Sequence, residues 1–256
     1  MTLQDKPQLL LEIGTEEIPA RFISIGTNRL KEQAERVFKD FRFDYSDIKT
    51  FGTPRRLSLI TNISPTQMTS EREIWGPPVS VAYDKDGKLT KAAETFIKNN
   101  SLHVDQLQQR QKGKGLYIFA KIKEPSHPII ELLPDVLKEI VLSVHFPKSM
   151  RWGSGNIRFV RPIHWILAMY DNKKITFEIE NIKSNNMTRG HRFLSPAYFE
   201  IRDSKTYINL LRNNFVILDP DERKKIILNS CQKIAESIDA VFVKDEDLIE
   251  HVANLV

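Results

Sequence analysis

The feature that most constrains the fold is a change of hydrophobic period near the start of the chain. The run from Leu9 to Ile13 (LLLEI) is almost wholly apolar and stops at Gly14, which is typical of a buried β-strand. Apolar residues then recur at helical spacing between Phe22 and Phe41, which predicts a helix of about twenty residues with one apolar face. A strand followed by a long amphipathic helix needs a sheet against which that helix packs.

The predicted start of this helix contains several residues suited to a helix N-terminus. Thr15 is a candidate N-cap, Glu16 and Glu17 suit the positive end of the helix dipole, and Pro19 suits the first turn. We favour this structural interpretation of the glutamates over the alternative, in which Glu12, Glu16 and Glu17 perform acid–base chemistry.

Turn-rich segments divide the chain further downstream. A strand is expected over residues 57–63, and loose segments rich in proline and polar residues follow at 64–78 and 124–128. A small inserted subdomain between them is expected to contain a strand at Val79–Tyr83, a turn at Asp84–Gly87, a helix at Lys91–Lys98, a hairpin turn at Gly113–Gly115 and a strand at Leu116–Ile122. Beyond Pro128, apolar pairs repeat every four residues and predict another amphipathic helix.

The last sixty residues are expected to be mostly helical. Ser204 is a candidate cap for a short helix, Phe215–Leu218 is expected to form a strand, and Asp219 and Glu222 have the spacing of a capping box that opens a helix to Ile238. A further helix begins near residue 248, and its apolar face continues to the last residue. We therefore interpret the chain as an N-terminal fragment of a longer protein.

These patterns predict an α+β fold with a mixed sheet packed against helices. We expect residues 1–65 and 128–200 to form the core domain, residues 66–127 an inserted α+β subdomain, and residues 201–256 the mostly helical start of a following region.

Composition limits the compartment and the chemistry. The chain has 256 residues, one cysteine and a net charge of +5, and it has neither a signal peptide nor an apolar run long enough to cross a membrane. We therefore expect a cytoplasmic protein with no membrane partner. The six histidines lack metal-ligand spacing, and the sequence contains no phosphate-binding loop, zinc-protease motif or nucleophile elbow, so we expect no metal site and no catalytic residue.

Basic residues concentrate in three segments. The segment from Lys148 to Arg161 also contains Arg151 and Arg158, includes no carboxylate, and is interleaved or followed by Trp152, Phe159, His164 and Trp165. Guanidinium groups bind phosphates and aromatic rings stack on unpaired bases, so this composition suits RNA. The other two basic segments are Thr53–Arg56, with Arg55 and Arg56, and Thr188–Phe193, with Arg189, His191 and Arg192. Alternatively, Phe159, Val160, Ile163, Trp165 and Ile166 are core, and the arginines of the segment from Lys148 to Arg161 pair with carboxylates elsewhere, such as Glu12, Glu16 or Glu17. The glycines at 153 and 155 would allow a sharp turn or a close approach to a ligand.

Five ordered blocks resemble the β subunit of bacterial heterotetrameric glycyl-tRNA synthetase. They are LLEIGTEEIPA at 10–20, TPRRL at 53–57, the stretch from Asp86 to Ala93, PKSMRWG at 147–153 together with FVRPIHW at 159–165, and RGHRF at 189–193. The resemblance covers almost the whole chain. In that family, further helical and anticodon-binding domains follow the corresponding region.

The resemblance implies that a separate α subunit activates glycine with ATP and Mg²⁺, while the β subunit supplies much of the contact with tRNA(Gly). This fragment would then bind no cofactor, would be inactive alone, and would help hold the acceptor arm; DNA is not expected as a partner. The resulting candidate tRNA-binding residues are Arg55, Arg56, Lys148, Arg151, Trp152, Arg158, Arg161, His164, Arg189, His191 and Arg192. Two alternatives remain open: a module for assembly of the α and β subunits, and, less favoured, an editing-type deacylase.

Overall fold

The computed structural model describes residues 6–152 and 155–255, so Gly153, one of the two glycines expected to allow a turn, lies outside the described residues. The chain divides into two compact units. One, here called the main unit, comprises the chain up to Gln67 and from His127 onward, and the other, the inserted unit, comprises Met68–Ser126. Residues 201–256 group with the main unit.

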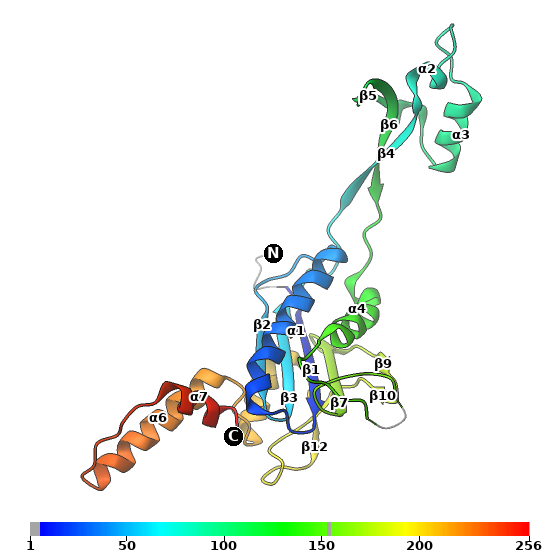
Figure 1. The fold of residues 1–256 in the computed structure, drawn as a ribbon. Helices are drawn as coiled ribbons and strands as arrows, with labels where there is room; N and C mark the ends of the chain where they lie inside the picture. The colour runs from blue at the N-terminus through cyan, green and yellow to red at the C-terminus, as the bar shows by residue number, and fades with distance from the viewer. Residues whose placement is uncertain (1–5, 153–154, 256) are drawn as a thin grey trace. The chain divides into compact units, whose positions relative to one another are not determined.

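The main unit is built on an antiparallel sheet in the order β2-β3-β1-β7-β8 (Figure 1). The strands are β2 (Lys49–Thr53), β3 (Arg56–Asn62), β1 (Gln8–Thr15), β7 (Ile163–Tyr170) and β8 (Lys173–Lys174). In the central strand, Leu11 lies opposite Leu59 of β3 and Ala168 of β7. The α+β class is thus confirmed, but every ladder between named strands is antiparallel, whereas a mixed sheet was expected.

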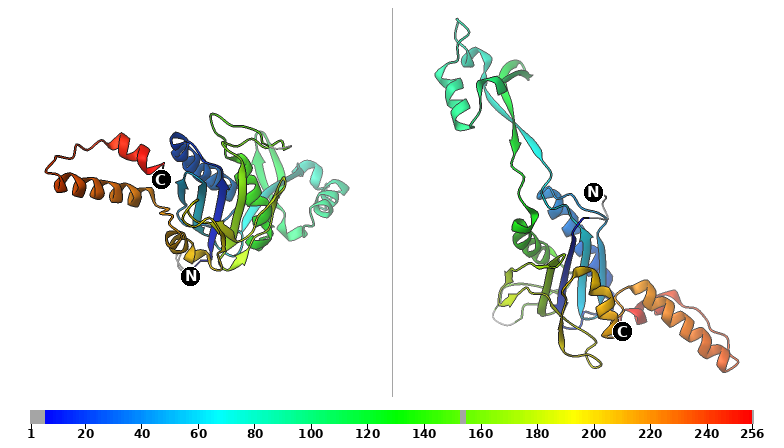
Figure 2. Two further views of the ribbon diagram at one scale, coloured as in Figure 1. Left: turned by 90° about the horizontal axis from the view of Figure 1, so that it is seen from below. Right: turned by 180° about the vertical axis from the view of Figure 1, so that it is seen from behind.

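Both faces of this sheet are covered. Leu9, Leu11 and Ile13 belong to a core shared with α1 (Ala20–Asp40) and α4 (Ile129–Ser143), the two helices that lie on one face (Figure 2). Leu10 points the other way, into a smaller core that includes Tyr207 and Leu211 of α5 (Tyr207–Asn213). Successive residues of a strand face opposite sides of a sheet, so the unbroken apolar run at the start of the chain is explained by burial on both faces.

The expected start of α1 is wrong in one respect. Thr15 does not cap the helix, because it is the last residue of β1 and pairs with Ile163 of β7. The helix begins at Ala20 with Pro19 as its N-cap residue, and its first turn contains no acidic residue. Glu16 and Glu17 therefore lie in the connection between β1 and α1, where they are available for other contacts.

The remainder of the main unit consists of short strands and three helical segments. The strands are β9 (Glu178–Ile179), β10 (Ile182–Lys183), β11 (Met187–Arg189) and β12 (Tyr198–Glu200). A 3₁₀ turn at Ser204–Thr206, capped by Asp203 rather than by Ser204, precedes α5, and α6 (Pro220–Ser237) and α7 (Glu246–Ala253) follow.

The helix predicted from residue 219 is confirmed, with a different cap. The Asp219 carboxylate accepts a hydrogen bond from the Asp221 N–H, but Glu222 pairs with Arg212 instead of completing a capping box. The strand expected at Phe215–Leu218 is wrong, because this segment has no strand structure.

The inserted unit contains a three-stranded antiparallel sheet in the order β4-β6-β5 and two helices. Its elements are β4 (Ser70–Pro78), α2 (Val79–Ala82), α3 (Lys91–Asn99), a 3₁₀ turn at Val104–Gln106, β5 (Gln108–Lys112) and β6 (Gly115–Glu124). The predicted α3 and β6 are confirmed, and Gly113, with φ of 61°, lies in the expected hairpin turn. The expected strand at Val79–Tyr83 is wrong, because that segment forms α2, and β4 occupies part of a segment expected to be loop.

Candidate nucleic-acid interface

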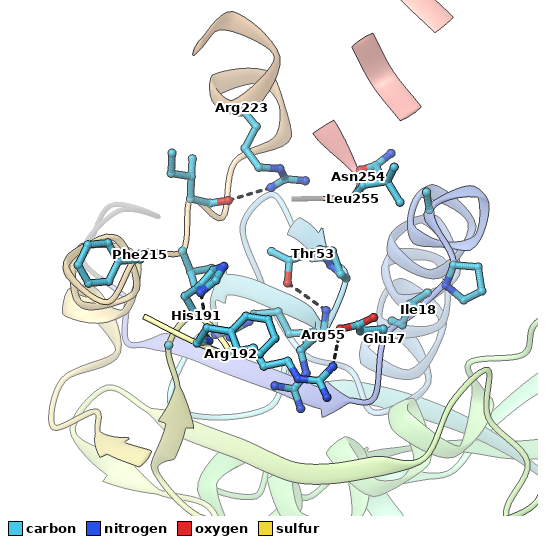
Figure 3. Close-up of a pocket in the computed structure, with 18 of the residues that line it drawn as sticks. Glu17, Ile18, Thr53, Arg55, His191, Arg192, Phe215, Arg223, Asn254 and Leu255 are labelled. Carbon is cyan, nitrogen blue, oxygen red and sulfur yellow. Dashed lines mark hydrogen bonds and ion pairs between the residues drawn. The ribbon is translucent and has the colours of Figure 1, made fainter. Parts of the chain in front are cut away.

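A cavity of about 730 Å³ lies in the main unit and is lined by segments distant in sequence. Its walls come from the connection between β1 and α1, the turn between β2 and β3, residues 190–193 after β11, the segment 215–217, α6, and residues 254–255 after α7 (Figure 3). The sheet and the helices thus position loops that no local sequence pattern relates to one another.

One wall of this cavity is cationic. Arg55, Arg161 and Arg192 line it, one from each of the three basic segments, together with His191. Each is placed by an ordered element: the turn between β2 and β3 holds Arg55, the residues leading into β7 hold Arg161, and those leaving β11 hold His191 and Arg192. The arrangement gathers positive charge around one concave surface.

Arg55 has the most unusual environment of these cations. Burial lowers the pKa of its guanidinium, and the charges of Arg189 and Arg192 lower it further, while Glu16 and Glu17 act in the opposite direction. The Nε atom is buried and has no hydrogen-bond partner among the described residues. Because like charges surround a partly desolvated cation, an anion in the cavity would stabilise the charged form of Arg55.

Two glutamates balance part of this charge. Arg192 Nη1 lies 2.7 Å from Glu17 Oε1 and 3.7 Å from Glu16 Oε1, and Arg161 Nε donates to the Glu17 backbone carbonyl at 2.9 Å. The alternative expectation was that the arginines of the segment from Lys148 to Arg161 pair with carboxylates; the ion pairs with Glu16 and Glu17 are instead made by Arg192, and Arg161 contacts the Glu17 backbone. The Arg192 and Glu17 side chains are 47% and 58% exposed, and such surface pairs contribute only about 0–1 kcal/mol. A phosphate could replace the carboxylate at small cost.

His164 joins the same cluster through Glu16. Its Nε2 lies 3.1 Å from Glu16 Oε2. Burial acts to raise the pKa of Glu16, but hydrogen bonds from His164 and from the Glu17 N–H, with the charge of Arg55, lower it on balance. Glu16 therefore stays anionic and orients its neighbours, which differs from its expected role at a helix N-terminus.

The rest of the cavity lining is largely apolar. Phe193 and Phe215 are 79% and 60% exposed, and Ile226 and Leu255 are 43% and 59% exposed. Ile18 and Pro19 contribute further apolar surface. A cationic wall beside exposed aromatic and aliphatic side chains suits a ligand with an anionic part and a flat, poorly charged part, as in a nucleotide.

Arg56 borders the cavity, but its side chain has a structural role. Its side chain is 2% exposed, with Nη1 3.3 Å from Glu12 Oε2 and Nη2 donating to the Arg189 carbonyl at 2.8 Å. Glu12 is fully buried and also accepts hydrogen bonds from Thr188 Oγ1 at 2.6 Å, from the Trp165 indole N–H and from the Tyr207 hydroxyl. The RNA contact expected of Arg56 stays a prediction, and the structure shows its guanidinium already engaged in a buried network.

The remaining predicted residues do not line the cavity. Lys148, Arg151 and Arg158 are exposed on the segment before β7, while Trp152 is half-buried and packs against the main core. This segment lacks carboxylates of its own, and Glu180 accepts hydrogen bonds from its backbone at Asn156 and Ile157. Lys148, Arg151 and Arg158 thus form a separate exposed basic surface.

Arg189 lies behind the cavity wall. Its guanidinium donates to the Pro196 carbonyl through Nε and Nη2 at 3.0 and 2.9 Å and lies over the Tyr198 ring at 4.8 Å from the ring centroid. It holds the loop that carries His191 and Arg192.

The sequence analysis missed the lining residues contributed by the helical segment, among them Phe215, Ile226 and Arg223. Arg223 is 4% exposed and donates to four backbone carbonyls, those of Gly52, Ile217, Leu218 and Ala253. An arginine inside an amphipathic helix gives no sequence signal of such a role, since its partners are backbone groups.

Within the described ranges 6–152 and 155–255, no group of three or more His, Cys, Asp or Glu side chains could hold a metal ion. In the same part of the chain, no helix combines the length and the apolar character needed to cross a membrane.

Comparison of the sequence with known proteins identifies first the class of protein and then the family. The model of the family described as "Glycyl-tRNA synthetase beta subunit" matches residues 9–256. The chain is 43% identical over 249 residues to the "Glycine--tRNA ligase beta subunit" of Thermodesulfovibrio yellowstonii, an alignment that covers 97% of this chain and 37% of that protein. Identity to proteins of the same name is 41% in Clostridioides difficile (98% of this chain, 37% of the relative) and 40% in Syntrophus aciditrophicus (97% and 36%).

These relatives are components of aminoacyl-tRNA ligases by name, and the match extends over nearly the entire chain. The chain belongs to the glycyl-tRNA synthetase β-subunit family, as the five sequence blocks indicated. It spans a little more than a third of the length of the curated relatives it matches.

Proposed function

We propose that this chain is the part of a glycyl-tRNA synthetase β subunit that binds tRNA(Gly) and positions its acceptor arm, without taking part in glycine activation. The observation that carries the proposal is the convergence of Arg55, Arg161 and Arg192 on one cavity whose other lining residues are largely apolar. The relatives' name, glycine–tRNA ligase, indicates the reaction, which is ligation of glycine to tRNA.

The proposed mechanism is phosphate neutralisation combined with capture of an unpaired nucleotide. Arg55 and Arg192 would hold a backbone phosphate, and Phe193 and Phe215 offer surfaces for a base or ribose. Glu17 would release Arg192 when the phosphate arrives. Holding the end of the tRNA in a fixed orientation contributes to the reaction by proximity rather than by bond chemistry.

The name "beta subunit" of the relatives implies a partner subunit. We propose that this partner is the α subunit and that the two act together in the cytoplasm. In this proposal, ATP and Mg²⁺ are used by the α subunit, and this chain alone is inactive in aminoacylation. Its role is to present the RNA.

The test is tRNA binding by the chain across a series of salt concentrations. The double variant Arg55→Ala/Arg192→Ala is expected to weaken binding of tRNA(Gly) at least tenfold. It should also reduce the slope of log K against log salt by about 0.7–0.9, the contribution of the one phosphate contact that the two arginines share. Fluorescence anisotropy of labelled tRNA measures both quantities.

The matched control is Arg29→Ala/Arg202→Ala, which removes two exposed arginines of the main unit that do not line the cavity. It should bind tRNA within about twofold of the parent chain. Equal affinities for the cavity variant and the control would contradict the proposal.

An assembly role is the second candidate, favoured by apolar side chains exposed around α6. Val241, Val243 and Ile238 are 90%, 82% and 68% exposed. If the double cavity variant binds tRNA normally, while Val241→Asp/Val243→Asp prevents association of the complete β subunit with the α subunit, the assembly function replaces tRNA positioning.

A further inference from the structure

The sheet of the inserted unit has two different faces. One packs against α2 and α3 through a small core of Ile118, Ala82 and Ala93. Gly76 of β4 lies against this core, and a Cβ there would meet Ile118 at 2.8 Å and Phe96 at 2.9 Å. The other face holds the side chains that alternate with Ile118 along β6 and those paired with them on β4 and β5.

Aromatic rings and cations are layered on this second face. Trp75 and Phe119 lie opposite each other in the β4–β6 ladder, with ring centroids 5.5 Å apart and planes 28° from parallel. Arg110 lies over the Phe119 ring, 4.1 Å from its centroid, and Lys112 Nζ lies 4.8 Å from the centroid of the Trp75 ring. Arg110 Nη1 donates to both oxygens of the Glu73 carboxylate, at 2.7 and 2.8 Å, and this ion pair helps hold the guanidinium over the ring.

Exposed lysines extend this face. Lys121, opposite Glu73, and Lys123, opposite Glu71, alternate with Phe119 along β6 and are exposed, as is Lys112. Residues 108–124 contain five lysines and arginines and a single carboxylate. This hairpin alone therefore carries +4, against +5 for the whole chain.

We propose that this face of the inserted unit, defined by Trp75, Arg110, Lys112, Lys121 and Lys123, is a second RNA-binding surface that takes single-stranded RNA. Bases would stack on the Arg110 guanidinium and the partly exposed Trp75 ring, and the lysines would neutralise the backbone. An acidic protein partner would satisfy the lysines equally well, but it would make no use of the guanidinium and aromatic groups that lie together on this face. The proposal does not depend on the cavity of the main unit, since the two share no residue.

The test uses the 256-residue chain and a labelled single-stranded RNA of about twelve nucleotides, a length that one such binding surface can cover. The face variant Lys112→Glu/Lys121→Glu is expected to weaken binding about tenfold and to lower the salt dependence. Arg110→Lys keeps the charge but removes the stacking plane, so a loss of about threefold is expected.

The matched control is Lys91→Glu/Lys98→Glu, which makes the same change of charge on exposed positions of α3 in the same unit. It should bind the RNA within about twofold of the parent, and circular dichroism of each variant verifies folding.

Several outcomes would overturn the proposal. Equal affinities of the face variant and the control would do so, as would absence of RNA binding by the parent chain. If the face variant binds RNA normally but no longer associates with the α subunit, the face is a protein-binding surface instead.

One outcome separates the two proposals. If the face variant loses RNA binding while the cavity variant binds normally, the result supports this surface and contradicts the proposed role of the cavity.

Discussion

At the scale of single residues, Glu12 organises a buried network that reaches the cavity through Arg56. It is a fully buried carboxylate with one cationic partner, Arg56, and hydrogen bonds from Trp165, Thr188 and Tyr207. These donors come from strands and helices that are far apart in sequence. Their convergence on one charge ties β1, β3, β7, β11 and α5 together.

Replacing Arg56 with methionine should therefore be costly for stability. The variant leaves the buried Glu12 charge without a counter-ion, and breaking such a pair costs about 3–5 kcal/mol in the free energy of unfolding. Urea denaturation measures the loss. The double variant Glu12→Gln/Arg56→Met removes the unpaired charge as well and should be more stable than the single variant; a double variant that is less stable would contradict this account.

Tyr170 predicts a dependence of stability on alkaline pH. Burial, with a smaller effect of the Asp171 charge, raises the pKa of its hydroxyl from 10.0 to about 12, and the hydroxyl donates to the Ile63 carbonyl at 3.0 Å. The folded state holds this proton more tightly than the unfolded state. The resulting stability is complete below pH 10 and is lost between pH 10 and 12, by about 1.4 kcal/mol per pH unit.

The variant Tyr170→Phe isolates this effect, because it cannot lose a proton. The free energy of unfolding of the parent chain should fall more steeply than that of the variant between pH 10 and 12, as measured by urea denaturation at each pH. Parallel profiles for the two proteins would show that Tyr170 does not titrate as proposed.

Residue types could be predicted from the sequence better than their surroundings. The concentration of arginine near residues 55, 161 and 192 is visible in the sequence, and these residues do meet at one cavity. Nothing in the sequence distinguishes Arg55, whose charge faces Arg189, Arg192 and two glutamates at the cavity, from Arg56, which is 2% exposed and paired with the buried Glu12. The difference arises from strand alternation and from partners more than forty residues away.

At the scale of elements, the clearest periodic patterns gave correct predictions. Each of these patterns arises because one face of the element must pack against the core. They are the apolar stripes of α1 and α4 and the buried run of β1. The polar strand β4 was missed because its outward residues, from Glu71 to Glu73, are exposed and carry no apolar alternation. Its pairing with β6, more than forty residues further along the chain, forms it.

The position of α6 depends on one side chain. Arg223 joins this helix to β2, to the segment before the helix and to the end of α7 through four carbonyl groups. Arg223→Lys keeps the charge but cannot reach all four acceptors, so α6 and α7 should open more often. Amide hydrogen exchange in residues 220–253 should speed up at least tenfold, while exchange in β1 is unchanged.

The control for this prediction is Arg212→Lys, which alters an exposed ion pair with Glu222 in the same region. Exchange in the control should match that of the parent. Equal protection of α6 in the two variants would show that the carbonyl contacts of Arg223 do not hold the helix.

At the scale of the whole molecule, the inserted unit is joined to the main unit through adjacent residues. The Gln67 N–H donates to the His127 carbonyl at 3.1 Å, and the His127 N–H donates to Gln67 Oε1 at 3.1 Å. Thr66 and Pro128 form an isolated bridge beside them. The two ends of the insertion are thus already side by side within the main unit.

Removing residues 68–126 and joining Gln67 to His127 through a short glycine-serine linker should leave the main unit folded. The expected change in its melting temperature is no more than about 2–4 °C, equivalent to about 1 kcal/mol in a domain of roughly 200 residues. Near-ultraviolet circular dichroism of Trp165 provides the check on packing. Loss of the cooperative transition would show that the main unit requires the insertion.

The composition of the cavity could not be predicted at this scale. Its lining extends from Glu17 to Leu255 and depends on the order of strands in the sheet. The resemblance to a family supplied an RNA-binding hypothesis, and basic composition supplied candidates. Only the topology brings three of them into one concavity.

The central place of β1 has a consequence for how the protein is synthesised. This strand leaves the ribosome before β3 and can pair with it early, but its other edge pairs with β7, which is about 150 residues further along the chain. At translation rates of roughly 5–20 residues per second, the hydrophobic edge of β1 stays unpaired for about ten to thirty seconds. A nascent chain of this family therefore passes through a period in which chaperones have an open strand edge to protect.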